Sequence, residues 1–203
     1  MPDRVRQRFG DVDYDWEQRV DTTSANVSFR ARFIGLLNSS YQPIEAPLFH
    51  EMLNGLGIDY PQFTFIDIGC GKGRPLLMAA EYPFHRIIGV ELLPELQRIA
   101  QENIRKFPQS RMRCNDIAAL QGDATRFAFP ADPLVVFMFH PLPESGFKRV
   151  VGNLAASIRE NPRPTWLIYA NPLFENIVIE SGIFRKDAGT EQYSIFAAHV
   201  PEW

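Results

Sequence analysis

Near residue 70 a short apolar segment runs directly into a glycine-rich turn, and this junction limits the folds open to the chain. Residues 63–68 read FTFIDI, an aromatic and β-branched run that is typical of a buried strand. Residues 69–74 read GCGKGR, and Pro75 then suits the first turn of a helix, where its missing N–H costs nothing. A strand, a glycine-rich turn and a helix in this order indicate an open α/β sheet that binds a ligand at the carboxyl ends of its strands.

Strand-like and helix-like segments alternate along the rest of the chain. Four more strands are expected, at residues 86–90, 117–121, 134–139 and 166–169. Helices are expected at residues 75–82, 94–107 and 144–159. Residues 183–199 alternate like an antiparallel hairpin. We therefore predict an α/β fold, a Rossmann-like and mostly parallel seven-stranded sheet with helices on both faces and an antiparallel C-terminal hairpin.

Residues 1–60 are less regular, with helix-like segments near residues 27–37 and 47–56. A chain of 203 residues is long enough for one well-buried core. We interpret residues 1–60 as a cap on the sheet edge and residues 61–203 as a Rossmann-like core, the two together forming one domain.

Composition excludes several classes of protein. Lys plus Arg number 21 against 24 Asp plus Glu, so no basic excess favours binding to nucleic acid or to an anionic membrane. The apolar run at residues 134–139 is far shorter than the roughly 20 residues that cross a bilayer. The N-terminus has no secretory pattern, so we expect a cytoplasmic protein. Only two cysteines occur, and the histidines have no ligand spacing, so no metal site is predicted.

The glycine spacing disfavours a dinucleotide. The G-x-G-x-x-G fingerprint requires glycine at position 74, where this chain has Arg74. Asp67 precedes the turn, and two like charges about 6 Å apart at an effective dielectric near 20 repel by about 3 kcal/mol. Beside a diphosphate this repulsion is a penalty. Beside the ammonium and sulfonium of S-adenosylmethionine the same carboxylate is favourable.

Two further acids follow the next strands. Glu91 ends the second strand, where an acid accepts hydrogen bonds from both ribose hydroxyls. Asp123 follows the third strand, where it suits the exocyclic amine of an adenine. Each acid has an alternative role as a helix N-cap or a solvated turn residue. Three acids at the ends of three successive strands favour the cofactor interpretation.

With these motifs the chain resembles the class I S-adenosylmethionine-dependent methyltransferases over roughly residues 60 to 200, most specifically over residues 65–96. It is similar to small bacterial members with Asp-x-Gly-x-Gly-Lys-Gly-Arg, here residues 67–74, Gly-Val-Glu, here residues 89–91, and an upstream Tyr-x-Pro, here residues 41–43.

The resemblance implies S-adenosylmethionine as the cofactor and methyl transfer as the activity. By this resemblance the glycine-rich turn lines the methionine part, Glu91 holds the ribose, Asp123 and Ala124 contact the adenine, and Tyr41 covers the cofactor. The implied cofactor-binding residues are Tyr41, Asp67, Gly69, Cys70, Gly71, Glu91, Leu92, Asp123 and Ala124.

The segment after the fourth strand bears on the methyl acceptor. Methyltransferases that act on amide or base nitrogens carry Asn or Asp, two prolines and an aromatic residue there, whereas residues 140–143 read HPLP. Nucleic acid and amide acceptors are therefore disfavoured. We favour a protein lysine amine as the acceptor. A small-molecule N- or O-methyltransferase and a non-catalytic domain that binds S-adenosylmethionine or a nicotinamide cofactor are the alternatives, and the sequence does not indicate an oligomeric state.

His140 is the candidate catalytic residue. A neutral imidazole near the methyl group takes a proton from an incoming amine or hydroxyl. The alternative is a structural histidine that packs behind Tyr41 or caps the turn before Pro141.

Overall fold

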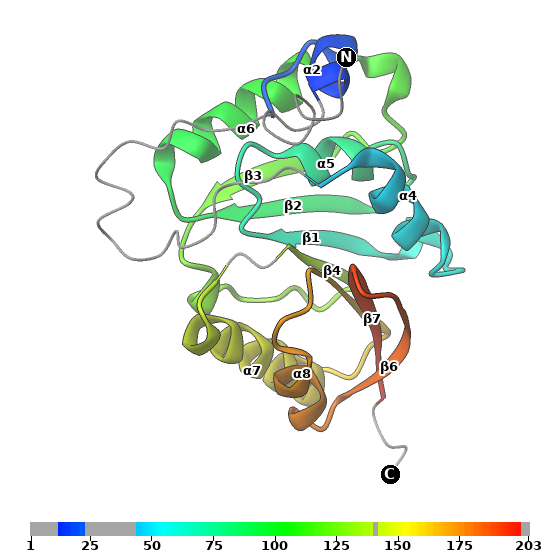
Figure 1. Cartoon of the computed structure of the whole chain (residues 1–203), viewed down its shortest axis with the longest axis vertical. Coiled ribbons are helices and arrows are strands. Elements are labelled where there is room, and N and C mark those ends of the chain that lie inside the picture. Colours follow the sequence, from blue (N-terminus) through cyan, green and yellow to red (C-terminus); the bar gives the residue numbers. More distant parts are fainter. Residues whose placement is uncertain (1–11, 23–43, 140–141, 200–203) are drawn as a thin grey trace.

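A seven-stranded sheet forms the centre of the protein in a computed structural model that describes residues 12–22, 44–139 and 142–199 (Figure 1). The strand order is β3-β2-β1-β4-β5-β7-β6. The strands are β1 (Thr64–Ile68), β2 (Arg86–Glu91), β3 (Ile117–Gln121), β4 (Leu134–Phe139), β5 (Thr165–Ala170), β6 (Phe184–Gly189) and β7 (Tyr193–Ala198).

The first five strands are parallel to one another, and β7 lies antiparallel between β5 and β6. This arrangement confirms the predicted mostly parallel sheet with an antiparallel C-terminal hairpin. Gly189 still pairs with Ser194, so the hairpin turn lies at residues 190–192.

Helices cover both faces of the sheet, with α4, α5 and α6 on one face and α7 and α8 on the other (Figure 1). Side chains of successive strand residues point to opposite faces of the sheet. Phe65 therefore packs in the core beneath α4, α5 and α6, and Ile66 packs in the core beneath α7 and α8. The described helices are α2 (Val12–Gln18), α4 (Ala46–Asn54), α5 (Arg74–Ala79), α6 (Pro94–Lys106), α7 (Glu144–Glu160) and α8 (Glu175–Glu180), with short 3-10 turns η1 (Tyr60–Gln62), η2 (Gln109–Arg111) and η3 (Ala124–Arg126).

One helix ends clearly earlier than the sequence predicts. The helix expected at residues 75–82 already ends at Ala79, before Pro83, which disfavours helical backbone in the residue that precedes it. The helix expected near residues 47–56 is α4, whereas the segment 27–37 lies outside the described residues. The helix α2 was not predicted, because its seven residues show no clear helical period.

No helix in the described ranges is long and apolar enough to cross a membrane.

Candidate cofactor site

The glycine-rich turn folds back over the end of β2. The N–H groups of Gly69 and Cys70 both donate to the carbonyl of Val90, at 2.8 and 3.1 Å. Gly69, Gly71 and Gly73 have φ values of 78°, 52° and 84°, in the left-handed region that side chains disfavour. The turn therefore depends on its glycines for shape.

Close packing beneath the turn leaves no room for a side chain at Gly89 of β2. A Cβ atom at Gly89 would lie 2.7 Å from Cys70 Sγ and 2.7 Å from Leu76 Cδ1. Cys70 is buried between the turn and β2, and burial, with Asp67 and Glu91 nearby, raises the pKa of its thiol well above the ordinary value. Cys70 thus fills the base of the turn as an uncharged thiol.

Asp67 lies near the carboxyl end of the central strand β1, where it is paired with Gly89 of β2 and Phe137 of β4. Its side chain is only 2% exposed, and among the described residues its Oδ2 atom has no hydrogen-bond partner. Burial raises the pKa of this carboxyl well above its usual range, and the neighbouring Glu91 raises it further. A buried carboxyl without a partner is costly unless a ligand compensates it.

Glu91 ends β2 and holds the turn in place. Its Oε2 atom accepts a hydrogen bond from the Gly71 N–H at 2.9 Å, and its Oε1 atom accepts one from the Leu93 N–H at 2.9 Å. Burial raises the pKa of the Glu91 carboxyl, although these backbone donors lower it. An ionised carboxylate has about four acceptor sites, so lone pairs remain for ribose hydroxyls. The sequence pointed to the ribose role but held no signal for the contact with Gly71.

Asp123 follows β3, which lies beside β2, with Gln121 paired to Glu91. Its Oδ1 atom accepts hydrogen bonds from the Thr125 N–H at 2.9 Å and the Thr125 hydroxyl at 2.7 Å, and these bonds lower the pKa of the Asp123 carboxyl. Asp123 therefore caps η3, which is the structural role that the sequence left open for it. Ala124 is buried behind it.

The structure brings most of the predicted site residues to one edge of the sheet. Asp67, Glu91 and Asp123 lie at the carboxyl ends of three adjacent strands, and the exposed Leu92 follows Glu91. Tyr41 and His140, also predicted, lie outside the described residues.

Sequence reasoning missed a set of contacts on the far side of the turn. The Lys72 ammonium pairs with Asp21 Oδ1 at 2.6 Å. The Arg74 side chain is fully buried, with its guanidinium carbon 4.2 Å from the centre of the Tyr14 ring. These partners are more than 50 residues away in the chain, so no local pattern reveals them.

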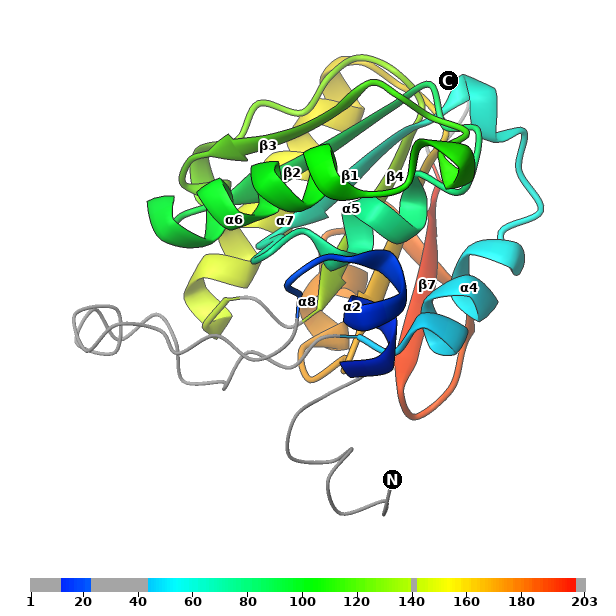
Figure 2. The same ribbon diagram turned by 90° about the horizontal axis from the view of Figure 1, so that it is seen from above.

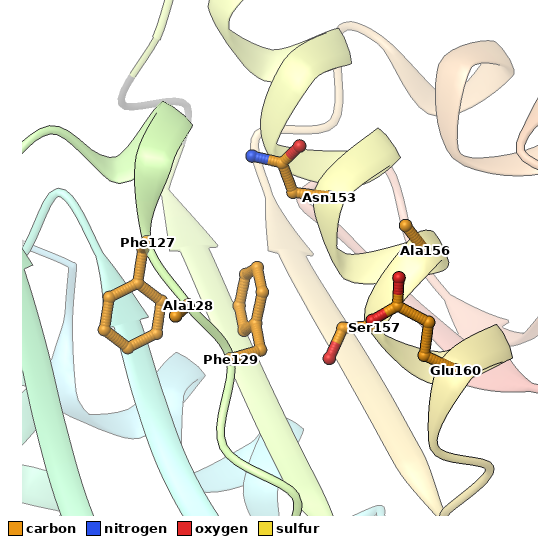
Figure 3. A pocket seen from close by; sticks show the side chains of 7 residues that line it. All are labelled: Phe127, Ala128, Phe129, Asn153, Ala156, Ser157 and Glu160. Carbon is orange, nitrogen blue, oxygen red and sulfur yellow. The ribbon is translucent and has the colours of Figure 1, made fainter.

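Two cavities elsewhere on the described surface share no residue with this edge. One, of about 290 Å³, lies between residues 127–129 and α7, and is lined by Phe127, Ala128, Phe129, Asn153, Ala156, Ser157 and Glu160 (Figure 3). The other, of about 390 Å³, lies between α6 and the edge strand β3. No cluster of three or more metal-binding side chains occurs in the described ranges.

Residues 65–161 match the family model of a methyltransferase domain. None of the curated proteins compared with this chain matches it.

Solved structures of methyltransferases share the fold. An RNA methyltransferase from Salinibacter ruber, solved with S-adenosyl-L-homocysteine, is 20% identical, with a TM-score of 0.51 over 79% of this chain and 97% of its own. A glycopeptide N-methyltransferase bound to sinefungin is 13% identical, with a TM-score of 0.59 over 82% of this chain and 91% of its own. A Listeria monocytogenes protein described as a putative S-adenosylmethionine-dependent methyltransferase is 12% identical, with a TM-score of 0.56 over 76% and 98%.

Proposed function

This chain carries a class I S-adenosylmethionine-dependent methyltransferase domain, and we propose that it transfers the methyl group to an amine, with a protein lysine side chain as the acceptor. The observation that carries the cofactor assignment is the Asp67 carboxyl. Its Oδ2 atom is buried and without a partner among the described residues, and a second buried acid, Glu91, lies nearby. Two buried acids at a strand end favour a cationic ligand and disfavour a diphosphate.

The residues at this edge fit S-adenosylmethionine part by part. Asp67 would hold the ammonium of the methionine part, and the remaining lone pairs of Glu91 would accept hydrogen bonds from the ribose hydroxyls. Asp123, Ala124 and Leu92 would contact the adenosyl group. S-adenosylmethionine supplies a methyl group that is already activated for transfer to a nucleophile.

The protein then has to align the acceptor, exclude water and receive a proton. His140 is the residue we propose for the proton, because it directly follows Phe139, the last residue of β4. β4 pairs with β1, the strand that carries Asp67. A neutral imidazole accepts a proton from an ammonium near pH 7, which leaves the amine lone pair free to attack.

Two features of the chain favour a lysine amine over amide and nucleic-acid acceptors. The sequence after β4 lacks the Asn or Asp, two prolines and aromatic residue that orient amide and base nitrogens. The net charge of −3 gives no general attraction to nucleic acid. The similar structures do not decide the matter, since their acceptors range from RNA to a glycopeptide.

The test is methyl transfer from labelled S-adenosylmethionine to a bacterial lysate. We expect the label in protein and, after acid hydrolysis, in methyllysine. The Glu91→Ala variant is the control and should label nothing above background. Label in a small molecule would favour the small-molecule N- or O-methyltransferase, and cofactor binding without any transfer would favour the non-catalytic domain.

The division into a cap of residues 1–60 and a core of residues 61–203, and the cytoplasmic location, remain predictions from the sequence.

A further inference from the structure

Asn103 of α6 makes hydrogen bonds to two segments that are far apart in the sequence. Its Nδ2 group donates to the Asp21 carbonyl at 2.8 Å and to the Lys72 carbonyl at 3.0 Å, and its Oδ1 atom accepts from the Asp21 N–H at 2.9 Å. The side chain is 1% exposed. One amide thus joins the helix, the glycine-rich turn and the N-terminal segment 12–22.

Other contacts hold the same N-terminal segment against the turn. Asp21 also pairs with the Lys72 ammonium at 2.6 Å. The end of the segment is itself fixed, because the Thr22 N–H donates to Asp15 Oδ2 at 2.7 Å and the Thr22 hydroxyl donates to Asp15 Oδ1. Figure 2 shows α2 beside the layer formed by α5 and α6.

The glycine-rich turn is therefore held from two sides. On the sheet side, Glu91 binds the N–H of Gly71. On the helix side, Asn103 binds the carbonyl of Lys72, the next residue. These bonds fix the Cys70–Gly71 and Lys72–Gly73 peptide groups, so the loss of either bond removes the restraint on one side of the turn.

We propose that Asn103 is a positioning residue for cofactor binding, which links the N-terminal segment 12–22 to the glycine-rich turn. This inference rests on the proposed function, because the turn is taken to line the methionine part of S-adenosylmethionine. In this role Asn103 sets the affinity for the cofactor without touching the acceptor or the transferred group.

The experiment measures S-adenosylhomocysteine affinity and turnover in the full chain. Asn103→Leu keeps the side-chain size and removes all three hydrogen bonds. We expect its Kd for S-adenosylhomocysteine and its KM for S-adenosylmethionine to rise at least tenfold, while kcat at saturating cofactor stays within about twofold of wild type. The Gly71 and Gly73 amides should exchange hydrogen faster. Glu102→Gln, at the adjacent α6 position, is the matched control and should leave all of these values unchanged.

A second variant covers the case in which Asn103→Leu does not fold. Asn103→Ala removes the same three hydrogen bonds without placing a large apolar side chain against the main-chain groups of Asp21 and Lys72. We expect its Kd to rise at least threefold with kcat preserved.

A folded Asn103→Leu variant with unchanged Kd, or one in which kcat falls while Kd stays constant, would overturn the proposal. If Asn103→Leu does not fold, an unchanged Kd in Asn103→Ala overturns it. Failure of the wild-type protein to bind S-adenosylhomocysteine would instead refute the proposed function.

Discussion

At the residue scale, Asp67 combines a cost in stability with a benefit in binding. The raised pKa means that the folded, ligand-free protein holds a proton on Asp67 more tightly than the unfolded chain does. Its contribution to stability is therefore present below the unfolded pKa and is lost as pH rises through the folded pKa. Above the unfolded pKa the raised pKa therefore costs the ligand-free fold stability, and a cationic ligand, which favours the ionised carboxylate, reduces that cost.

Asp67→Asn should therefore make the ligand-free protein more stable and the binding weaker. We expect Tm to rise on the order of 2–4 °C at pH 7.5, equivalent to roughly 1 kcal/mol. The difference should shrink as pH falls toward and below the unfolded pKa of about 3.9, where the carboxyl is protonated in both states. Affinity for S-adenosylmethionine should fall about tenfold or more, since hydrogen bonds to charged groups contribute about 1.5–3 kcal/mol. Thermal denaturation at several pH values and calorimetry measure both effects.

Asp123→Asn is the control for this prediction, because the pKa of Asp123 is lowered in the folded protein. Its stabilising effect is present above the unfolded pKa, so removal of the charge should not raise Tm at pH 7.5. A less stable Asp67→Asn variant with unchanged affinity would contradict the role assigned to Asp67.

His140 gives a second residue-scale prediction, which separates binding from turnover. If His140 takes the proton of the acceptor, His140→Ala should keep S-adenosylhomocysteine affinity within about threefold and lower turnover roughly 100-fold or more. Parallel calorimetry and methyl-transfer assays decide between the two roles. Combined loss of affinity and turnover, or full turnover across pH 6 to 9, would favour the structural role instead.

At the scale of elements, local sequence patterns predicted the strands and the starts of two helices. The period-2 and apolar runs predicted all seven strands, and Pro75 and Pro94 marked the first turns of α5 and α6. The residues that hold the turn were not predictable in this way. Asn103 reads as an ordinary polar helix residue, and its bond to Asp21 spans 82 positions in the chain.

At the same scale, alanine substitutions at two glycines should change the free energy of unfolding in opposite directions. Gly89→Ala places a methyl group 2.7 Å from Cys70 Sγ in a fully packed region, and overpacking of this kind costs about 1–3 kcal/mol. Gly152 lies at an exposed position inside α7 with open space around its Cβ position, so Gly152→Ala should stabilise the protein by about 0.5–1 kcal/mol. Urea denaturation of both variants measures the two free energies. An unchanged free energy of unfolding in Gly89→Ala would show that the turn does not pack tightly against β2.

At the scale of the whole molecule, the cofactor edge gathers parts of the chain that are distant in sequence. β1, β2 and β3 supply the three acids, and α6 and the segment 12–22 hold the turn from outside. A ligand that contacts this edge therefore binds only the folded chain, because the unfolded chain does not assemble it. Binding must raise the stability of the whole fold by mass action.

S-adenosylhomocysteine at 100 times its Kd should stabilise the protein by about 2.7 kcal/mol. For a domain of this size that corresponds to a rise in Tm of roughly 5–10 °C. NAD at the same concentration should leave Tm unchanged, because its diphosphate would meet the acids at the strand ends and Arg74 stands where the dinucleotide fingerprint needs glycine. Differential scanning calorimetry measures both shifts, with Glu91→Ala as the variant that should lose the response to S-adenosylhomocysteine. A larger rise with NAD than with S-adenosylhomocysteine would refute the assignment of this edge to S-adenosylmethionine.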